Sequence, residues 1–109
     1  MGIKVTENDV KKAILDYLAA KHVFAFRNNT GAFAGSYKGK ARFFRYGAKG
    51  SGDIFALHRG IFYSLECKAP GKVPSNDQLL WMEKVMINGG RAAYFNDIDS
   101  FIEWWDNQS

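Results

Sequence analysis

Cysteine and histidine are scarce, because the chain of 109 residues has one cysteine and two histidines. A single cysteine excludes an intramolecular disulfide framework and a cysteine-rich zinc site, and it fits a reducing compartment. His22 and His58 are isolated, since neither has a second histidine at metal-ligand spacing. We therefore expect both to be surface or turn residues rather than metal ligands or general bases.

Long apolar runs are also missing. Residues 1–7 lack the apolar core of a signal peptide, and no run approaches the ~20 residues that a membrane-spanning helix needs. The chain nevertheless holds enough apolar material for one packed core, with 47% hydrophobic and 16% aromatic residues. Because 109 residues are too few for two cores, we expect residues 1–109 to form one soluble, cytoplasmic domain.

Acidic residues are absent between Asp16 and Asp53, whereas the whole chain has 11 acids and 15 lysines and arginines. A segment of one charge sign attracts polyanions, or it is only a solvated face. The pattern favours nucleic-acid binding over the solvated face. The candidate nucleic-acid-binding residues of this interval are Lys38, Lys40, Arg42, Arg45 and Lys49.

The same interval contains an unusual connection over residues 31–50, where five glycines are interleaved with aromatic residues. A strand is expected only over residues 42–46. Long connections of this kind inside a compact domain are commonly functional, so its cations would meet phosphates and some aromatics could stack on unpaired bases. The alternative is a flexible loop whose aromatics belong to the core, and for any single aromatic residue this alternative is favoured.

Apolar periodicity predicts the elements at the N-terminal end. Apolar residues recur at helical spacing over residues 6–21, which predicts a helix capped by Thr6 or Asn8. A short strand follows over residues 23–27. Glu7 is expected on the helix face that packs on the sheet, either directed at an active site or simply favoured by the helix dipole in the first turn.

A capping box predicts the next helix. Ser75 and Gln78 have the spacing of such a box and open a helix over residues 78–87, which ends at three residues typical of a helix stop, Asn88-Gly89-Gly90. The helix is expected to bury Leu79, Met82 and either Val85 or Met86.

A strand over residues 91–95 follows this helix, and it is expected to lie parallel to the strand of Glu66 through a right-handed crossover. Asp97 or Asp99 then starts a final helix over residues 100–105. The aromatic residues of this helix either cover the core or form a dimer contact: Phe101, Trp104 and Trp105.

Two acidic residues are predicted to face each other across a hairpin. The β-prone runs on either side of Arg59-Gly60 predict a two-residue turn, and this register sets Asp53 opposite Glu66. Like charges in that arrangement destabilise a sheet unless a cation or a shared proton relieves them. Strand alternation places Lys68 on the side of Glu66 and Cys67 on the other side, as a small core hydrophobe. The electrostatic cost therefore indicates a metal site.

With Glu7, Gly52-Asp53, Glu66-Cys67-Lys68 and Gln78 in this order, the chain resembles the PD-(D/E)XK nuclease superfamily. More specifically, it is similar to a stand-alone VRR-NUC domain of the kind found in phage and related mobile elements, and the similarity covers nearly the whole chain. One departure is Gly52, where the family often has proline; glycine keeps the backbone able to turn tightly. The resemblance implies an α/β fold with a restriction-endonuclease-like mixed central sheet flanked by helices, an αβββαβ core.

The resemblance also implies roles for these residues. Asp53 and Glu66 would hold one or two Mg²⁺ or Mn²⁺ ions, with the Cys67 backbone carbonyl as a further ligand and Glu7 as a direct or water-bridged one. Lys68 would orient the nucleophile or neutralise the transition state, unless it forms an ordinary salt bridge to Asp53 or Glu66. Gln78 would position Lys68 or the water, and its capping role is an equal competitor.

The function implied is that of a metal-dependent endodeoxyribonuclease, structure-selective for branched DNA such as Holliday junctions or flaps, acting in the bacterial host cell if a phage encodes it. Because a domain this small presents little surface, a homodimer would cut two strands of a junction more easily. The main alternative is a non-catalytic nucleic-acid-binding module that kept the nuclease fold. An enzyme acting on a small phosphorylated molecule is disfavoured by the spread of the basic residues.

Overall fold

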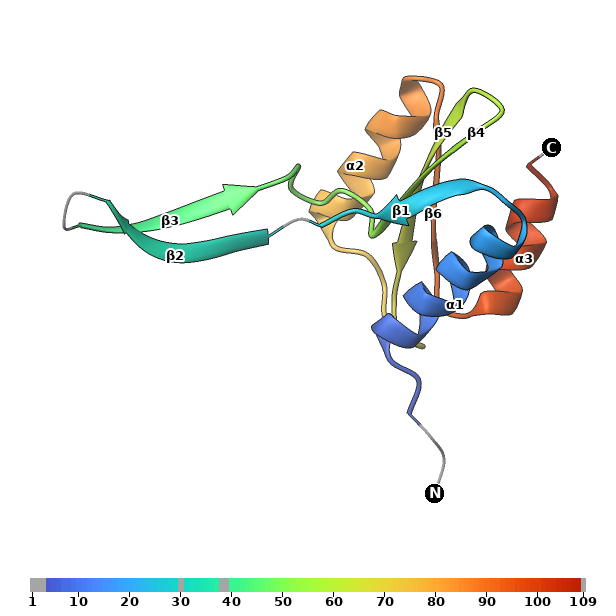
Figure 1. The fold of residues 1–109 in the computed structure, drawn as a ribbon, viewed down its shortest axis with the longest axis horizontal. Coiled ribbons are helices and arrows are strands. Elements are labelled where there is room, and N and C mark those ends of the chain that lie inside the picture. The colour runs from blue at the N-terminus through green and yellow to red at the C-terminus, as the bar shows by residue number, and fades with distance from the viewer. Residues whose placement is uncertain (1–3, 30, 38–39, 109) are drawn as a thin grey trace.

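The computed structural model describes residues 4–29, 31–37 and 40–108 (Figure 1). In chain order the helices and strands are α1 (Glu7–Ala20), β1 (Phe24–Arg27), β2 (Gly31–Tyr37), β3 (Lys40–Tyr46), β4 (Ile54–His58), β5 (Ile61–Cys67), α2 (Asn76–Ile87), β6 (Arg91–Phe95) and α3 (Ile98–Asp106). In this described part, no helix combines the length and apolarity that crossing a membrane requires. The expectation of an α/β fold with a mixed sheet is confirmed.

The main sheet has four strands in the order β1-β4-β5-β6. The pairs β1–β4 and β4–β5 are antiparallel, whereas β6 lies parallel to β5, as the sequence predicted. The β4–β5 register runs from His58↔Ile61 to Ile54↔Leu65, so the predicted two-residue turn is confirmed. Arg59 and Gly60 both have positive φ, 53° and 79°, which matches the turn type that continues the twist of paired strands.

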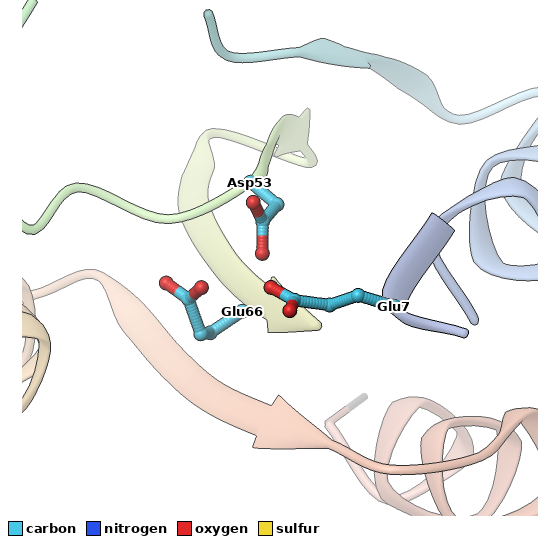
Figure 2. A group of neighbouring side chains, drawn as sticks. All are labelled: Glu7, Asp53 and Glu66. Carbon is cyan, nitrogen blue, oxygen red and sulfur yellow. The ribbon is translucent and has the colours of Figure 1, made fainter. Parts of the chain in front are cut away.

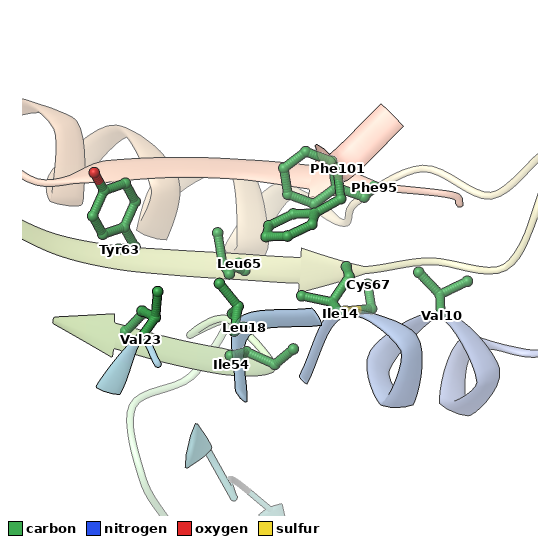
Figure 3. Close-up of a cluster of buried hydrophobic side chains, with 11 residues drawn as sticks. Val10, Ile14, Leu18, Val23, Ile54, Tyr63, Leu65, Cys67, Phe95 and Phe101 are labelled. Carbon is green, nitrogen blue, oxygen red and sulfur yellow. The ribbon is translucent and has the colours of Figure 1, made fainter. Parts of the chain in front are cut away.

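Helices α1 and α3 lie on one side of this sheet and α2 lies on the other (Figure 1). The core is formed between the sheet and the α1/α3 pair (Figure 3), where Ile14, Leu18, Leu65 and Phe101 are fully buried. Val10, Ile14 and Leu18 are the buried residues of α1, at the spacing that places them on one helix face.

The helix starts follow local capping chemistry. Thr6 caps α1 in a reciprocal box with Asp9, which selects Thr6 over Asn8, and Ser75 caps α2 in the predicted box with Gln78. Helix α2 buries Met82 and, of the two alternatives, Val85 rather than Met86, but the expected burial of Leu79 is wrong, since it is 49% exposed. The reason is that only a narrow stripe of α2 packs on the sheet, so the residues on either side of that stripe are exposed to solvent.

Helix α3 begins at Ile98, earlier than expected, with Asp97 as its cap. Phe101 is fully buried, and Trp104 and Trp105 pack partly buried against the same core. The interpretation of these rings as a cover for the core is therefore confirmed.

Residues 31–46 differ most from the prediction. Instead of an irregular connection with one strand over residues 42–46, β2 and β3 form a separate antiparallel sheet, with Phe33 opposite Phe44. Pairing satisfies the backbone groups of both segments, which an irregular loop could not do. This β2–β3 arm projects from the body (Figure 1), and the radius of gyration of 15.8 Å exceeds the ~13 Å of a compact domain of this length.

Candidate metal and catalytic centre

Three carboxylates converge at the end of β5 (Figure 2). Glu7 comes from the first turn of α1, Asp53 directly precedes β4, and Glu66 belongs to β5. One oxygen atom from each of the three lies within 4.8 Å of the others. The structure therefore brings together the three acids that the sequence selected, with Glu7 exposed, Asp53 half-buried and Glu66 buried.

Backbone hydrogen bonds fix Asp53 against β5. Its amide donates to the Leu65 carbonyl at 2.9 Å, and its Oδ2 accepts from the Cys67 amide at 2.8 Å. Gly52 allows this approach, because a Cβ at that position would collide with Ser64 Oγ and lie 3.0 Å from the Leu65 carbonyl oxygen. The glycine is thus needed for lack of space beside β5, rather than for the tight turn that the sequence suggested.

Glu66 carries the strongest electrostatic perturbation of the site. Burial, followed by a hydrogen bond to Asp53 and the negative charge of Asp53, raises the pKa of Glu66 to about 9, with a smaller contribution from Glu7. The charge of Lys68 acts in the opposite direction. Without a cation, Glu66 therefore holds a proton at neutral pH, because two adjacent carboxylates resist simultaneous ionisation.

Two lysines lie at this centre, and only Lys68 was predicted. Lys11 Nζ lies 3.4 Å from Asp53 Oδ1. It follows Glu7 by four residues in α1, and this helical spacing is the signal that could have found it. Lys68 is half-buried and makes no ion pair with any carboxylate of the described residues, so the alternative of an ordinary salt bridge to Asp53 or Glu66 is not what the structure has.

Gln78 caps α2 as predicted, and it also reaches the centre, where its partner is Glu66 rather than the predicted Lys68. Its Oε1 accepts from the Ser75 amide at 2.8 Å, which completes the cap of α2. Its Nε2 donates to Glu66 Oε1 at 3.1 Å. The start of α2 therefore fixes the orientation of the Glu66 carboxyl group.

Asn28 connects the arm to the centre, a role the sequence did not suggest. Its side-chain amide donates to Ser51 Oγ at 2.7 Å and to the Gly52 carbonyl at 2.8 Å. Its backbone amide donates to the Asp53 carbonyl at 2.8 Å. Since Asn28 precedes β2 and these partners follow β3, the two ends of the arm are joined beside Asp53.

The basic candidates fall into three groups. Lys40, Arg42 and Arg45 belong to β3, and Lys38 lies outside the described residues. Lys49 is exposed and forms an ion pair of 3.2 Å with Asp77, next to the start of α2. The structure therefore places three of the predicted DNA-binding residues, Lys40, Arg42 and Arg45, in the strand β3 of the arm.

Among the described residues, the cysteine and histidine side chains do not join the acid cluster. Cys67 is fully buried, and burial is the main cause that raises the pKa of its thiol to about 12, so it is the inert core residue that the sequence predicted. His22 is exposed at the end of α1 with φ of 59°, and His58 lies against Trp105, ring centroids 5.6 Å apart. Within the described residues, Glu7, Asp53 and Glu66 form the one such cluster of candidate ligands.

The donor set suits a hard divalent cation. Mg²⁺ and Mn²⁺ prefer carboxylate oxygens and keep several waters, which an exposed Glu7 leaves room for. Asp53 Oδ2 accepts from the Cys67 amide and Oδ1 faces Lys11, and each carboxylate oxygen still has a lone pair for a metal once the Glu66 proton is lost. Neither the models of known protein families nor the curated proteins compared with this chain match it. The chemistry of the centre is therefore argued from its own residues.

Proposed function

We propose that this protein is a metal-dependent endonuclease of the PD-(D/E)XK type, similar to a stand-alone VRR-NUC domain, that hydrolyses phosphodiester bonds in DNA. The observation that carries the proposal is the convergence of Glu7, Asp53 and Glu66 within 4.8 Å. Such a cluster is electrostatically costly unless a cation neutralises it. Burial, together with the neighbouring Asp53, raises the pKa of Glu66 to about 9, so ionising Glu66 is unfavourable unless a cation is present.

The order of elements supports the restriction-endonuclease-like assignment. When the arm is set aside, the chain reads α1, β1, β4, β5, α2, β6, α3, and its first six elements follow the order expected of an αβββαβ core. In this core the acids lie on the central strand pair β4–β5 and on the first helix. A centre made from several elements is held more rigidly than one on a single loop.

The roles follow from position. Asp53, Glu66, the Cys67 backbone carbonyl and Glu7 would hold Mg²⁺ or Mn²⁺. The bound metal would supply a water of lowered pKa and stabilise charge on the scissile phosphate. Lys68, unpaired beside Glu66, would orient the nucleophile or neutralise the transition state. Gln78 would keep the Glu66 carboxylate in one orientation.

The arm supports DNA as the substrate. Lys40, Arg42 and Arg45 lie on β3, and cations contact phosphates without regard to sequence. Strands of seven residues span about 23 Å. Because Asn28 anchors the arm beside Asp53, it can reach DNA at a distance from the scissile bond. A contact of that kind reads the shape of the DNA, as selectivity for junctions or flaps requires.

The alternative function is a non-catalytic nucleic-acid-binding module. Clustered acids argue against it, since they repel phosphates and a pure binder gains nothing from them. The unpaired Lys68 argues against it as well, because a structural lysine in such a cluster would be expected to pair with an acid.

Cleavage of labelled Holliday junction, flap and linear duplex DNA with Mg²⁺ or Mn²⁺ tests the proposal. Asp53→Asn removes a ligand charge and is expected to lower the rate at least 10³-fold, about the scale of losing a principal electrostatic group. Asp16→Asn is the matched control, since Asp16 is an exposed α1 residue that pairs only with Lys12 among the described residues. Wild-type protein that cuts none of these substrates overturns the catalytic assignment.

A further inference from the structure

A cavity of about 230 Å³ lies at the hairpin end of the four-stranded sheet. Its walls include Arg59 of the β4–β5 turn, Trp105 of α3, and the pair Tyr63 and Arg91, which lie opposite each other on β5 and β6. Tyr63 is three residues from Glu66 along β5, a separation of about 10 Å, and strand alternation directs these two side chains to opposite sides of the sheet. The cavity is therefore separate from the acid centre.

The charged groups of this cavity are all cationic. None of its lining residues is an aspartate or a glutamate, and two are arginines, Arg59 and Arg91. Arg91 is half-buried, and its Nη1 donates to the backbone carbonyl of Gln108 at 3.1 Å and to the Gln108 Oε1 at 2.8 Å. A guanidinium group has more N–H donors than these two contacts use. Neither arginine forms an ion pair with a carboxylate of the described residues, so both can bind an anion from outside.

Arg59 occupies a turn position that does not favour arginine. Its φ of 53° lies in the left-handed region, where two-residue turns of this type prefer Asn, Asp or Gly. A long side chain at positive φ is strained, and strain of this kind is commonly found at binding sites. The turn itself does not account for an arginine here, whereas the position of its side chain at the cavity does.

Tyr63 brings a polar group to the cavity from the core. The residue is 3% exposed, and its ring centroid lies 4.7 Å from that of Trp105. Figure 3 shows its hydroxyl pointing away from the other apolar side chains. Among the described residues this hydroxyl has no hydrogen-bond partner, and it is not sealed from solvent, so it opens on the cavity that Tyr63 lines. A tyrosine hydroxyl in such surroundings usually has a partner.

We propose that this cavity binds a small phosphate monoester whose remainder is a flat ring system, the chemistry of a nucleoside 5′-monophosphate. A phosphate monoester carries a charge of about −1.5 to −2 at pH 7, which matches two guanidinium groups, whereas a carboxylate would leave one arginine without a partner. The planar fork of arginine also fits phosphate oxygens. The rings of Tyr63 and Trp105 form an apolar wall against which the flat ring can pack.

The size of the cavity favours a small ligand. Pockets for drug-sized molecules start near ~300 Å³, so about 230 Å³ has space for one ring system and its phosphate rather than for a polymer. The inference is independent of the nuclease proposal, because none of the three acids lines this cavity. A protein that binds the monophosphate without cutting DNA leaves it standing.

Calorimetric titration with adenosine 5′-monophosphate (AMP) in EDTA tests the inference. EDTA prevents the phosphate from binding through a metal at the acid centre. Wild type is expected to bind AMP with a dissociation constant below about 1 mM, and at least about 10-fold more tightly than adenosine, which lacks the phosphate, or inorganic phosphate, which lacks the ring. No binding of AMP in this range, or equal affinity for adenosine or inorganic phosphate, overturns the proposal.

Arg59→Asn locates the binding site. Asparagine is favoured at this turn position, so the melting temperature is expected to be no lower than that of wild type. The dissociation constant for AMP is expected to rise at least about 10-fold, since a charged hydrogen-bond donor is lost. Lys72→Asn is the matched control, because it removes the same charge from an exposed residue outside the cavity, and it should bind AMP like wild type. An unchanged affinity in Arg59→Asn, or an equal loss in Lys72→Asn, overturns the proposal.

The 5′ end of a DNA strand presents the same terminal group on a polymer. A 5′-phosphorylated oligonucleotide is expected to leave the binding of AMP to wild type unchanged, because the cavity is too small for a strand. An oligonucleotide that displaces AMP only when it carries the 5′ phosphate would assign the cavity to strand ends and overturn the small-ligand proposal.

Discussion

The two sides of the four-stranded sheet are built from alternate residues of the same strands, yet they differ in burial. On the side of α1 and α3, Ile54, Ala56, Leu65 and Cys67 are at most 1% exposed. On the other side, the residues between them include Asp53 and Glu66 at one end and Phe55 and Leu57 toward the other. One side, the closed one, therefore forms the core, whereas the other, the open one, carries Glu66 and leaves Phe24, Phe26 and Leu57 exposed.

Phe101→Ala is expected to give the largest effect and to test the closed side. Phe101 is fully buried, with ring centroids 5.1 Å from Phe95 and 5.9 Å from Tyr17. Losing it should lower the free energy of unfolding by about 3–5 kcal/mol. Phe24→Ala on the open side should cost less than about 1 kcal/mol, because its ring is already hydrated in one chain. Urea denaturation at protein concentrations where the chain is monomeric measures both, and equal losses would contradict the contrast.

The second largest effect is expected for Lys68→Ala, and comparing it with Lys11→Ala distinguishes the roles of the two lysines at the centre. The cleavage rate is expected to fall about 10²–10³-fold, since a charge at the transition state is lost, while DNA binding is retained. Lys11→Ala should lower it less than about 10-fold, because Lys11 already pairs with Asp53 at 3.4 Å and a metal would take over its charge. Single-turnover cleavage alongside binding to uncut DNA measures the pair; a larger loss in Lys11→Ala would reverse the assignment.

The smallest effect concerns pH and the metal. Glu66 has its ordinary pKa of 4.5 when unfolded and about 9 when folded. Between these values the folded protein holds more protons, so its contribution to stability is complete below pH ~4.5 and is lost as the pH rises toward ~9. Mg²⁺ favours the ionised carboxylates, so it should raise the melting temperature more at pH 8 than at pH 5.

Thermal melts with EDTA or Mg²⁺, compared between wild type and Glu66→Gln, isolate this contribution. In EDTA the stability of wild type relative to Glu66→Gln is expected to fall as the pH rises. A difference that stays constant or grows in favour of wild type would show that Glu66 does not hold a proton in the folded, metal-free protein.

Local chemistry explains which features the sequence predicted. A two-residue turn at Arg59-Gly60 leaves one register for the hairpin, so the meeting of Asp53 and Glu66 followed directly. Capping boxes span only four residues, so the start of α2 was predictable too. The period of a helix fixes its apolar stripe but not the width of the surface it meets, which is why Leu79 was misplaced.

Tertiary placement explains what was missed. The contacts of Lys11 with Asp53 and of Asn28 with Gly52 join elements that are far apart in the chain. No pattern within one element encodes these partners, although the four-residue spacing from Glu7 places Lys11 on the same face of α1. In the arm, the two glycines of β2, Gly31 and Gly35, suggested interruptions, because their compatibility with strand pairing depends on the partner strand. The nuclease fold and function remain proposals that the acid cluster supports.

Gly52 has a consequence for how this site can change over generations. A side chain at position 52 would meet Ser64 Oγ, and that oxygen already accepts a hydrogen bond from the Trp81 indole at 2.7 Å. Positions 52, 64 and 81 are therefore expected to vary as a set: a larger residue at 52, such as proline, requires a smaller one at 64 and a new partner for the indole. Substitution here proceeds by compensated exchange rather than by single replacements.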